Sequence, residues 1–158
     1  MDISRDGRYI VSGSGDRTVR MWDLDSGQNS ITLSIEDGVT CVAISPKGNL
    51  IAAGSLDRGL RVWDALTGYL IKRIEGHTDS IYSIAFALHS EHLISASLDK
   101  TIRLWRLQEE IQPSVSNTTH ADCVRTFEGH KVLLVSIYTS CGVLTAFPVR
   151  FYSAYNGN

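Results

Sequence analysis

Short stretches in which apolar and polar residues alternate recur along most of the chain. Apolar side chains occupy every second position in TVRMW (18–22), LRVW (60–63) and TIRLW (101–105). Alternation with a period of two is the pattern of a half-buried β-strand. A second apolar run precedes each stretch, at 9–14, 50–55 and 93–97, and a turn precedes each of those runs, at 4–8, 45–49 and 87–91. The pattern predicts many short strands separated by tight turns.

The strands belong to a repeat of about 41 residues. Trp22, Trp63 and Trp105 are 41 and 42 residues apart, and an aspartate stands six residues before each of them. One further apolar run, at 39–45 and again at 80–86, completes each unit. Four strands per unit at this period is typical of a β-propeller blade. The sequence therefore predicts an all-β fold of about three four-stranded antiparallel blades, at 1–34, 35–74 and 75–131, with a polar insertion at 108–122 in the last.

Both ends of the chain depart from this repeat. Met1 falls inside what should be an innermost strand, so we expect further sequence upstream, and a closed propeller needs typically about four to eight blades. Residues 132–158 contain no Trp, Asp or Glu and form an atypical tail. Because every valine codon begins with GT, the usual start of an intron, one hypothesis is that the tail from Val132 is translated intron. The alternative is a genuine, divergent terminus.

Composition narrows the function classes. Hydrophobic residues make up 43% and charged residues 20%, an ordinary globular balance. The net charge is −2, and residues 1–131 carry −3 because the tail contributes only Arg150. This disfavours direct nucleic-acid binding, which needs a clustered basic surface. Three scattered cysteines predict no disulfide framework. We expect no secretory signal and no membrane span, and hence a cytoplasmic or nuclear location.

The repeat residues resemble those of WD-repeat proteins. More narrowly, the segments SGSGDRTVRMWDL (12–24), SIEDGVT (34–40), IAAGSLDRGLRVWD (51–64) and GHTDSIYSIAF (76–86), with the polar insertion, resemble the Tup-type fungal transcriptional corepressors of the Groucho/Tup group. The resemblance implies a nuclear corepressor whose propeller docks DNA-bound repressors. A separate helical segment contacts a tetratricopeptide-repeat adaptor in that group. The alternative is a WD scaffold of another class, such as a ubiquitin-ligase substrate receptor or an assembly factor, or a cytoplasmic protein.

The same resemblance implies a structural hydrogen-bond set in each blade. The third blade matches it fully, with His77, Ser95, Asp99 and Trp105. The first blade keeps Ser12, Asp16 and Trp22. The second keeps Asp57 and Trp63 but has Ala53 in place of the hydroxyl and Ile35 in place of the histidine, so we expect it to depend on apolar packing.

Candidate chemistry is sparse. Asp99, His77 and Ser95 have the composition of a catalytic triad, but the family repeats these residues structurally. The pairs His89–His92 and His120–Cys123 have ligand-like spacing, yet no further ligands stand near them, and surface turns are the better interpretation. No phosphate-binding glycine loop is present. The sequence predicts no enzyme, no metal and no cofactor.

A protein-binding face is predicted where the turns between second and third strands meet the loops before the first strands. Leu56 and Leu98 are unusual in tight turns, which favour polar residues or glycine. One interpretation is that each leucine tucks into the neighbouring blade. The other is an apolar anchor with a basic rim, a composition that suits a protein-binding hot spot. The residues of that predicted face are Tyr82, Leu56, Leu98, Arg17, Arg58 and Lys100.

Overall fold

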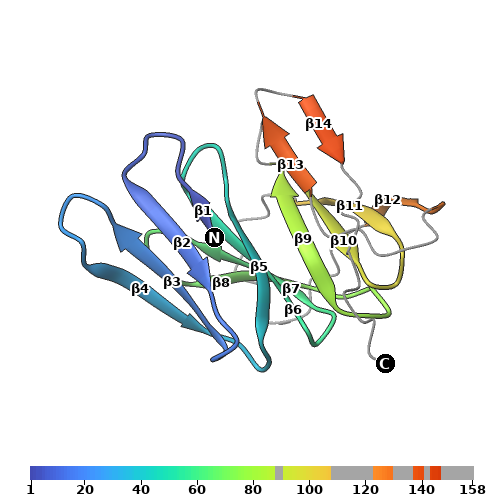
Figure 1. Cartoon of the computed structure of the whole chain (residues 1–158), viewed down its shortest axis with the longest axis horizontal. Helices are drawn as coiled ribbons and strands as arrows, with labels where there is room; N and C mark the ends of the chain where they lie inside the picture. The colour runs from blue at the N-terminus through green and yellow to red at the C-terminus, as the bar shows by residue number, and fades with distance from the viewer. Residues whose placement is uncertain (88–90, 108–122, 130–136, 141–142, 147–158) are drawn as a thin grey trace, which may run out of the picture.

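The computed structural model describes residues 1–87, 91–107, 123–129, 137–140 and 143–146. In these residues every regular element is a β-strand, and the strands form three four-stranded antiparallel sheets and one hairpin (Figure 1). The prediction of an all-β chain built from four-stranded antiparallel sheets is confirmed. None of the described residues belongs to a helix that is long and apolar enough to cross a membrane.

Within each sheet the strands follow one another in chain order. The first sheet contains β1 (Asp2–Ile3), β2 (Tyr9–Gly13), β3 (Thr18–Asp23) and β4 (Asn29–Ser34). The second contains β5 (Val39–Ile44), β6 (Leu50–Ser55), β7 (Leu60–Asp64) and β8 (Leu70–Ile74). The third contains β9 (Ile81–Phe86), β10 (His92–Ser97), β11 (Ile102–Arg106) and β12 (Cys123–Phe127).

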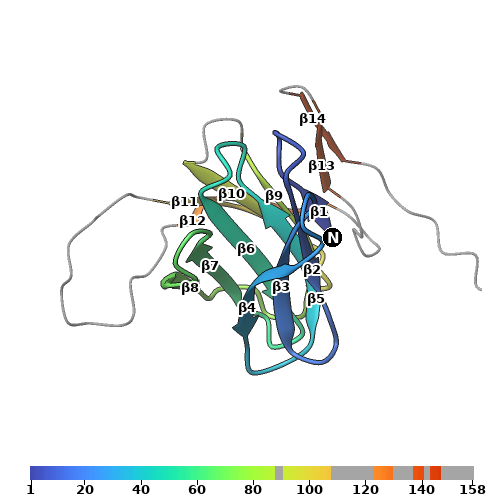
Figure 2. The same ribbon diagram turned by 90° about the vertical axis from the view of Figure 1, so that its left-hand side faces the viewer.

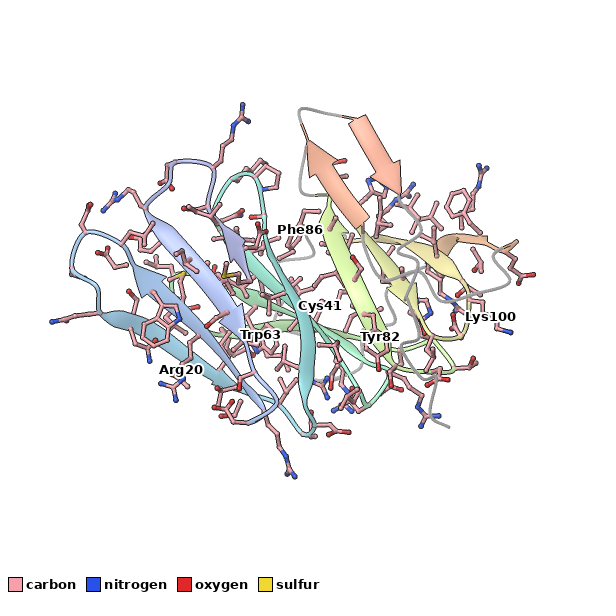
Figure 3. The ribbon with its side chains drawn as sticks, in the orientation of Figure 1. Arg20, Cys41, Trp63, Tyr82, Phe86 and Lys100 are labelled. Atoms are coloured by element: carbon pink, nitrogen blue, oxygen red, sulfur yellow. The ribbon has the colours of Figure 1, made fainter. Side chains whose placement is uncertain are left out.

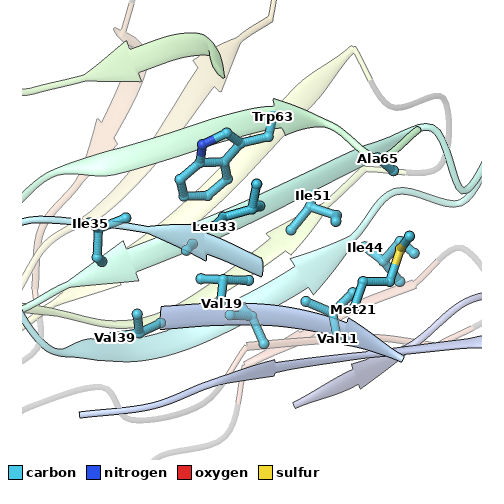
Figure 4. Close-up of a cluster of buried hydrophobic side chains, with 12 residues drawn as sticks. Val11, Val19, Met21, Leu33, Ile35, Val39, Ile44, Ile51, Trp63 and Ala65 are labelled. Atoms are coloured by element: carbon cyan, nitrogen blue, oxygen red, sulfur yellow. The ribbon is translucent and has the colours of Figure 1, made fainter. Parts of the chain in front are cut away.

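Adjacent sheets pack face to face. One apolar cluster lies between the first and second sheets, where Val11, Val19 and Met21 meet Ile51 and Trp63 (Figure 4). A second cluster lies between the second and third sheets and includes Leu60, Val62, Leu93 and Trp105. The alternation of β3 explains the arrangement, because Val19 and Met21 are buried whereas Thr18 and Arg20 are only half-buried.

Small residues on the second strands permit this close packing. A Cβ atom added to Gly13 would lie 2.4 Å from Cγ1 of Val39, on the next sheet. One added to Gly54 would lie 2.8 Å from Cγ2 of Ile81, again on the next sheet. Real Cβ atoms do not approach other atoms so closely, so only glycine fits at these two contacts.

The last described strands form a hairpin rather than a four-stranded sheet. β13 (Ile137–Ser140) pairs with β14 (Val143–Ala146), and β13 contacts β9, the first strand of the third sheet (Figure 1). The predicted insertion at 108–122, and the rest of the predicted tail, lie outside the described residues. The origin of the tail stays a hypothesis.

Candidate functional site

Four side chains of the third sheet form a chain of hydrogen bonds beneath the turn between β10 and β11. Trp105 Nε1 donates to Oγ of Ser95 over 2.8 Å. Ser95 Oγ lies 2.7 Å from Nε2 of His77, and Nδ1 of His77 lies 2.7 Å from Oδ2 of Asp99. The structure thus brings together all four residues of the set that the sequence predicted for the third blade. We call this set the relay.

The donors of the relay determine its protonation. An indole N–H can only donate, so Ser95 Oγ accepts from Trp105 and its own hydroxyl hydrogen remains for Nε2 of His77. The hydrogen of the neutral imidazole is then on Nδ1 and is donated to Asp99. Burial lowers the pKa of His77, more than the Asp99 carboxylate beside it raises it, which favours this neutral form.

Asp99 also holds the turn together. Its carboxylate accepts hydrogen bonds from the Thr101 hydroxyl (2.7 Å) and from the backbone N–H groups of Thr101 (2.9 Å) and Thr78 (3.1 Å). Although burial alone would raise it, the bonds from Thr101, His77 and the backbone lower the pKa of Asp99 to about 2. The carboxylate is therefore ionised and fully used by the fold.

This geometry does not suit a catalytic triad. Ser95 is completely buried, and its oxygen is already bonded to Trp105 and His77. A nucleophile must reach a substrate and keep a free oxygen lone pair for attack. Ser95 meets neither requirement, so its hydroxyl serves the fold. Among the described residues, no three potential metal-binding side chains gather at one place.

The first sheet keeps part of the relay. Trp22 Nε1 donates to Oγ of Ser12 over 2.9 Å. Asp16 bonds only within its turn, to the hydroxyl and the backbone N–H of Thr18 (2.6 and 3.0 Å). The hydroxyl–indole bond therefore forms even where no histidine is present to continue it.

The second sheet uses ion pairs that the sequence did not predict. Asp57 Oδ2 lies 2.5 Å from the guanidinium of Arg61, which also binds Glu36. Glu36 in turn lies 2.8 Å from Arg73. The Arg61 side chain is only 3% exposed. Trp63 is buried in the apolar cluster with Ile35 and Ala53, as the predicted apolar packing requires, but the aspartate beside it has a charged partner. An arginine two residues before each tryptophan, at 20, 61 and 103, was the available signal.

The three turns that hold these aspartates share one conformation. In the turns 14–18, 55–59 and 97–101, the backbone N–H of the fourth residue donates to the carbonyl of the first, as in Arg17 N to Ser14 O (3.2 Å). The fourth residue, Arg17, Arg58 or Lys100, has a φ of 70°, 71° or 69°. Such left-handed backbone favours glycine and costs a side chain about 1–2 kcal/mol. All three basic residues are exposed.

Backbone hydrogen bonds connect the three turns into a continuous edge. Val39 N donates to the carbonyl of Ser14 (3.1 Å), which joins the first turn to the second sheet. Leu56 N donates to Gly38 O (3.1 Å), and Ser80 Oγ donates to Leu56 O (3.1 Å). Leu98 N donates to Ser80 O (2.9 Å) and completes the run. We call this edge the turn ledge; it comprises the three turns with Gly38, Ser80 and Tyr82.

The predicted face residues all lie on or beside the turn ledge. Leu56 is 42% exposed and Leu98 is 38% exposed, so neither leucine is buried in a neighbouring sheet. Tyr82 is half-buried and is the extra residue of a β-bulge, since Ala96 pairs with Ser83 and Ser97 with Ile81. Figure 3 shows Tyr82 and Lys100 on the third sheet. A bulge reorients a side chain at the end of a strand.

Comparison with known proteins identifies the repeat. The family model described as "WD domain, G-beta repeat" matches residues 1–23, 27–64 and 68–106. The solved structure of U3-55K is similar in fold, with a TM-score of 0.72 and 24% sequence identity over 84% of this chain and 39% of that one.

Curated relatives carry the repeat in longer chains. Nuclear distribution protein PAC1 of Coccidioides posadasii is 32% identical over 144 residues, which cover 78% of this chain and 28% of the relative. E3 ubiquitin-protein ligase COP1 of Pisum sativum is 30% identical over 152 residues (90% and 21%). Periodic tryptophan protein 2 homolog of Caenorhabditis elegans is 30% identical over 151 residues (93% and 16%). The chain spans less than a third of the length of each of these relatives.

Proposed function

The chain belongs to the WD domain, G-beta repeat family, and on this premise we propose that it is a scaffold that binds a protein partner along the turn ledge. The observation that carries the proposal is the run of hydrogen bonds that aligns three turns, each with an exposed basic residue in left-handed backbone. Strained, non-glycine conformations persist where the surrounding structure fixes them, and they cluster at binding sites.

The ledge has the composition of an interaction hot spot. Leu56 and Leu98 offer aliphatic anchors, Tyr82 adds a half-buried aromatic ring, and exposed basic side chains surround them. Binding energy at protein interfaces is concentrated in such apolar anchors, while the charged rim excludes water and steers the partner. The matching partner is a short amphipathic segment with an apolar centre and acidic flanks.

The finer proposal is that the partner is a DNA-bound repressor and that the chain acts as a nuclear transcriptional corepressor, with a tetratricopeptide-repeat adaptor as a further partner. Support comes from the resemblance of SIEDGVT (34–40) and of the segment GHTDSIYSIAF (76–86) to Tup-type corepressors. Both segments run into the first strands of their sheets, and each contributes a loop residue, Gly38 or Ser80, to the turn ledge.

The second candidate is a substrate receptor of a ubiquitin ligase. The similarity to E3 ubiquitin-protein ligase COP1 over 90% of this chain favours it. The two candidates differ in consequence rather than in the surface used. Tethering the chain to a reporter promoter represses transcription if it is a corepressor, whereas a substrate receptor promotes ubiquitylation of the bound partner.

A peptide selection tests the ledge. A displayed library is selected on the purified chain, and the affinity of an enriched peptide is measured by calorimetry. We expect acidic flanks around an apolar centre, binding that weakens with salt, and a loss of roughly 1–3 kcal/mol in Leu98→Asp or Tyr82→Ala. Leu66→Asp, at a fully separate turn, is the matched control. Equal binding by folded Leu98→Asp and Tyr82→Ala proteins would refute the proposal.

A further inference from the structure

Four apolar side chains project from the turn between β7 and β8 and from the start of β8. Leu66 is 88% exposed, Tyr69 73%, Leu70 44% and Ile71 47%. We call these four residues the rim patch. β8 is the outermost strand of the second sheet, and the patch lies at the opposite end of β7 from the turn ledge (Figure 2). Contiguous exposed apolar patches on soluble proteins mark interaction sites more often than isolated apolar residues do.

The first sheet shows that the turn itself does not require these side chains. Its turn between β3 and β4 has the same construction. Asp23 Oδ1 accepts from Ser26 N (2.8 Å) as Asp64 Oδ1 accepts from Thr67 N (2.7 Å), and Gly27 and Gly68 have φ of 67° and 71°. The positions that correspond to the rim patch hold Asp25, Gln28, Asn29 and Ser30, which are all polar. The apolar residues therefore serve something other than the turn.

The rim patch stands on a fixed backbone. Asp64 accepts hydrogen bonds from Leu66 N (3.0 Å), from the Thr67 hydroxyl (2.8 Å) and, through its carbonyl, from Gly68 N (2.9 Å). A Cβ atom added to Gly68 would lie 3.2 Å from Cδ2 of Leu33, so the first sheet supports the turn from behind. A partner that binds a turn already ordered pays little conformational entropy.

The surroundings favour one kind of partner. Arg73, beside the patch, is already paired with Glu36 (2.8 Å) and Glu75 (3.2 Å), and both glutamates are well exposed. Exposed carboxylates disfavour an anionic membrane surface. Ile71 is a bulge residue, since Trp63 pairs with Leu70 and Val62 with Lys72, and a bulged edge resists addition of another strand.

We propose that the rim patch is a second protein-binding surface, whose partner receives Leu66 and Tyr69 in an uncharged apolar groove. Side chains exposed to this degree protrude, so a complementary surface is concave. Because the neighbouring charges are neutralised within the chain, burial of apolar area provides the affinity, and binding responds weakly to salt. The surface is separate from the turn ledge, so both can be occupied together.

Site-specific photo-crosslinking followed by measurement of affinity tests the proposal. Benzoylphenylalanine replaces Tyr69 in the full chain, and Gln28 in a control chain, inside living cells. We expect position 69, and not position 28, to form an adduct with one protein. That protein is then purified and titrated against the chain and against the double variant Leu66→Asp/Tyr69→Gln, which carries the residues of the first sheet's turn.

The double variant is expected to weaken binding about tenfold or more. Its melting temperature should match that of the unmodified chain, because the first sheet already accommodates these residues. Between roughly 0.05 M and 0.5 M salt the affinity should change less than about twofold. Binding unaffected by the double variant, adducts only between two copies of this chain, or attachment to phosphatidylserine-containing vesicles that the variant abolishes would each overturn the proposal.

Discussion

The second and third sheets place an aspartate at the same position of the same turn, yet a different side chain satisfies each one. Asp57 binds Arg61, from the strand that follows its own turn. Asp99 binds His77, from the loop before the first strand of its sheet. Position 35, which corresponds to His77, holds an isoleucine that is buried with Trp63 (Figure 4). Where the loop supplies no imidazole, the arginine takes its place.

Arg103, the counterpart of Arg61 in the third sheet, shows the other side of this exchange. Because Asp99 is already bonded to His77, the guanidinium of Arg103 lies over the Trp105 ring, 5.8 Å from its centre. Its Nε is buried and has no hydrogen-bond partner within the described part of the chain. One turn aspartate therefore accepts a neutral relay or an ion pair, and the residue in the preceding loop decides between them.

The largest expected effect is in the second sheet. Arg61→Met leaves Asp57 and Glu36 without their common cation and should lower the free energy of unfolding by about 3 kcal/mol, because one member of a buried ion pair is removed. Arg73→Met removes only the exposed pair with Glu36 and should cost about 0.5 kcal/mol or less. Urea denaturation of both variants measures the difference. Similar losses would show that burial of Arg61 is not what matters.

The relay should be the next most sensitive. Asp99→Ala removes the acceptor for His77, Thr101 and the backbone of Thr78, and should cost about 2 kcal/mol. Asp16→Ala, in the exposed turn that bonds only Thr18, should cost about 1 kcal/mol or less. Thermal and urea unfolding compare the two variants directly. If Asp16→Ala were the more destabilising, the relay would not be the stabilising feature.

A smaller, pH-dependent effect should separate the two sheets. The folded pKa of His77 lies below the ordinary 6.5, so on acidification the unfolded chain binds the proton first. The contribution of His77 to stability is therefore lost as pH falls below about 6.5. Asp57 and Asp99 both have lowered pKa values, and their losses begin only below the ordinary 3.8. His77→Asn should remove the loss near pH 6; a pH profile that keeps this loss in the variant would assign it elsewhere.

The smallest effect sharpens the comparison by adding a hydroxyl to the second sheet. Ala53→Ser puts an acceptor near Trp63, as Ser95 provides for Trp105. Without a histidine at position 35 the relay remains incomplete, so stability should change by about 1 kcal/mol or less. Calorimetric melting of Ala53→Ser beside Ser95→Ala is the measurement. A gain as large as the loss in Ser95→Ala would mean that two members of the relay are enough.

The sequence predicted what periodicity controls and missed what depends on a single loop residue. Alternating strands and the spacing of Trp22, Trp63 and Trp105 predicted three four-stranded sheets, because strand pairing and burial both follow that pattern. The resemblance named His77, Ser95, Asp99 and Trp105, which the structure brings together. The ion pair of Arg61 with Asp57 and Glu36 was missed, because no spacing rule joins residues from a loop, a turn and a strand. The left-handed Arg17, Arg58 and Lys100 also gave no signal, since their side chains do not favour that conformation.

The most direct test of the account is a hydrogen–deuterium exchange footprint of a bound peptide selected on the chain. The account predicts slower amide exchange along the turn ledge, at 14–17, 38–39, 56–58, 80–82 and 98–100, with no change at 64–71. The protected segments should be the same at low and high salt, although less peptide is bound at high salt. Protection confined to 64–71, or to the exposed side of the first sheet near Arg20 (Figure 3), would contradict it.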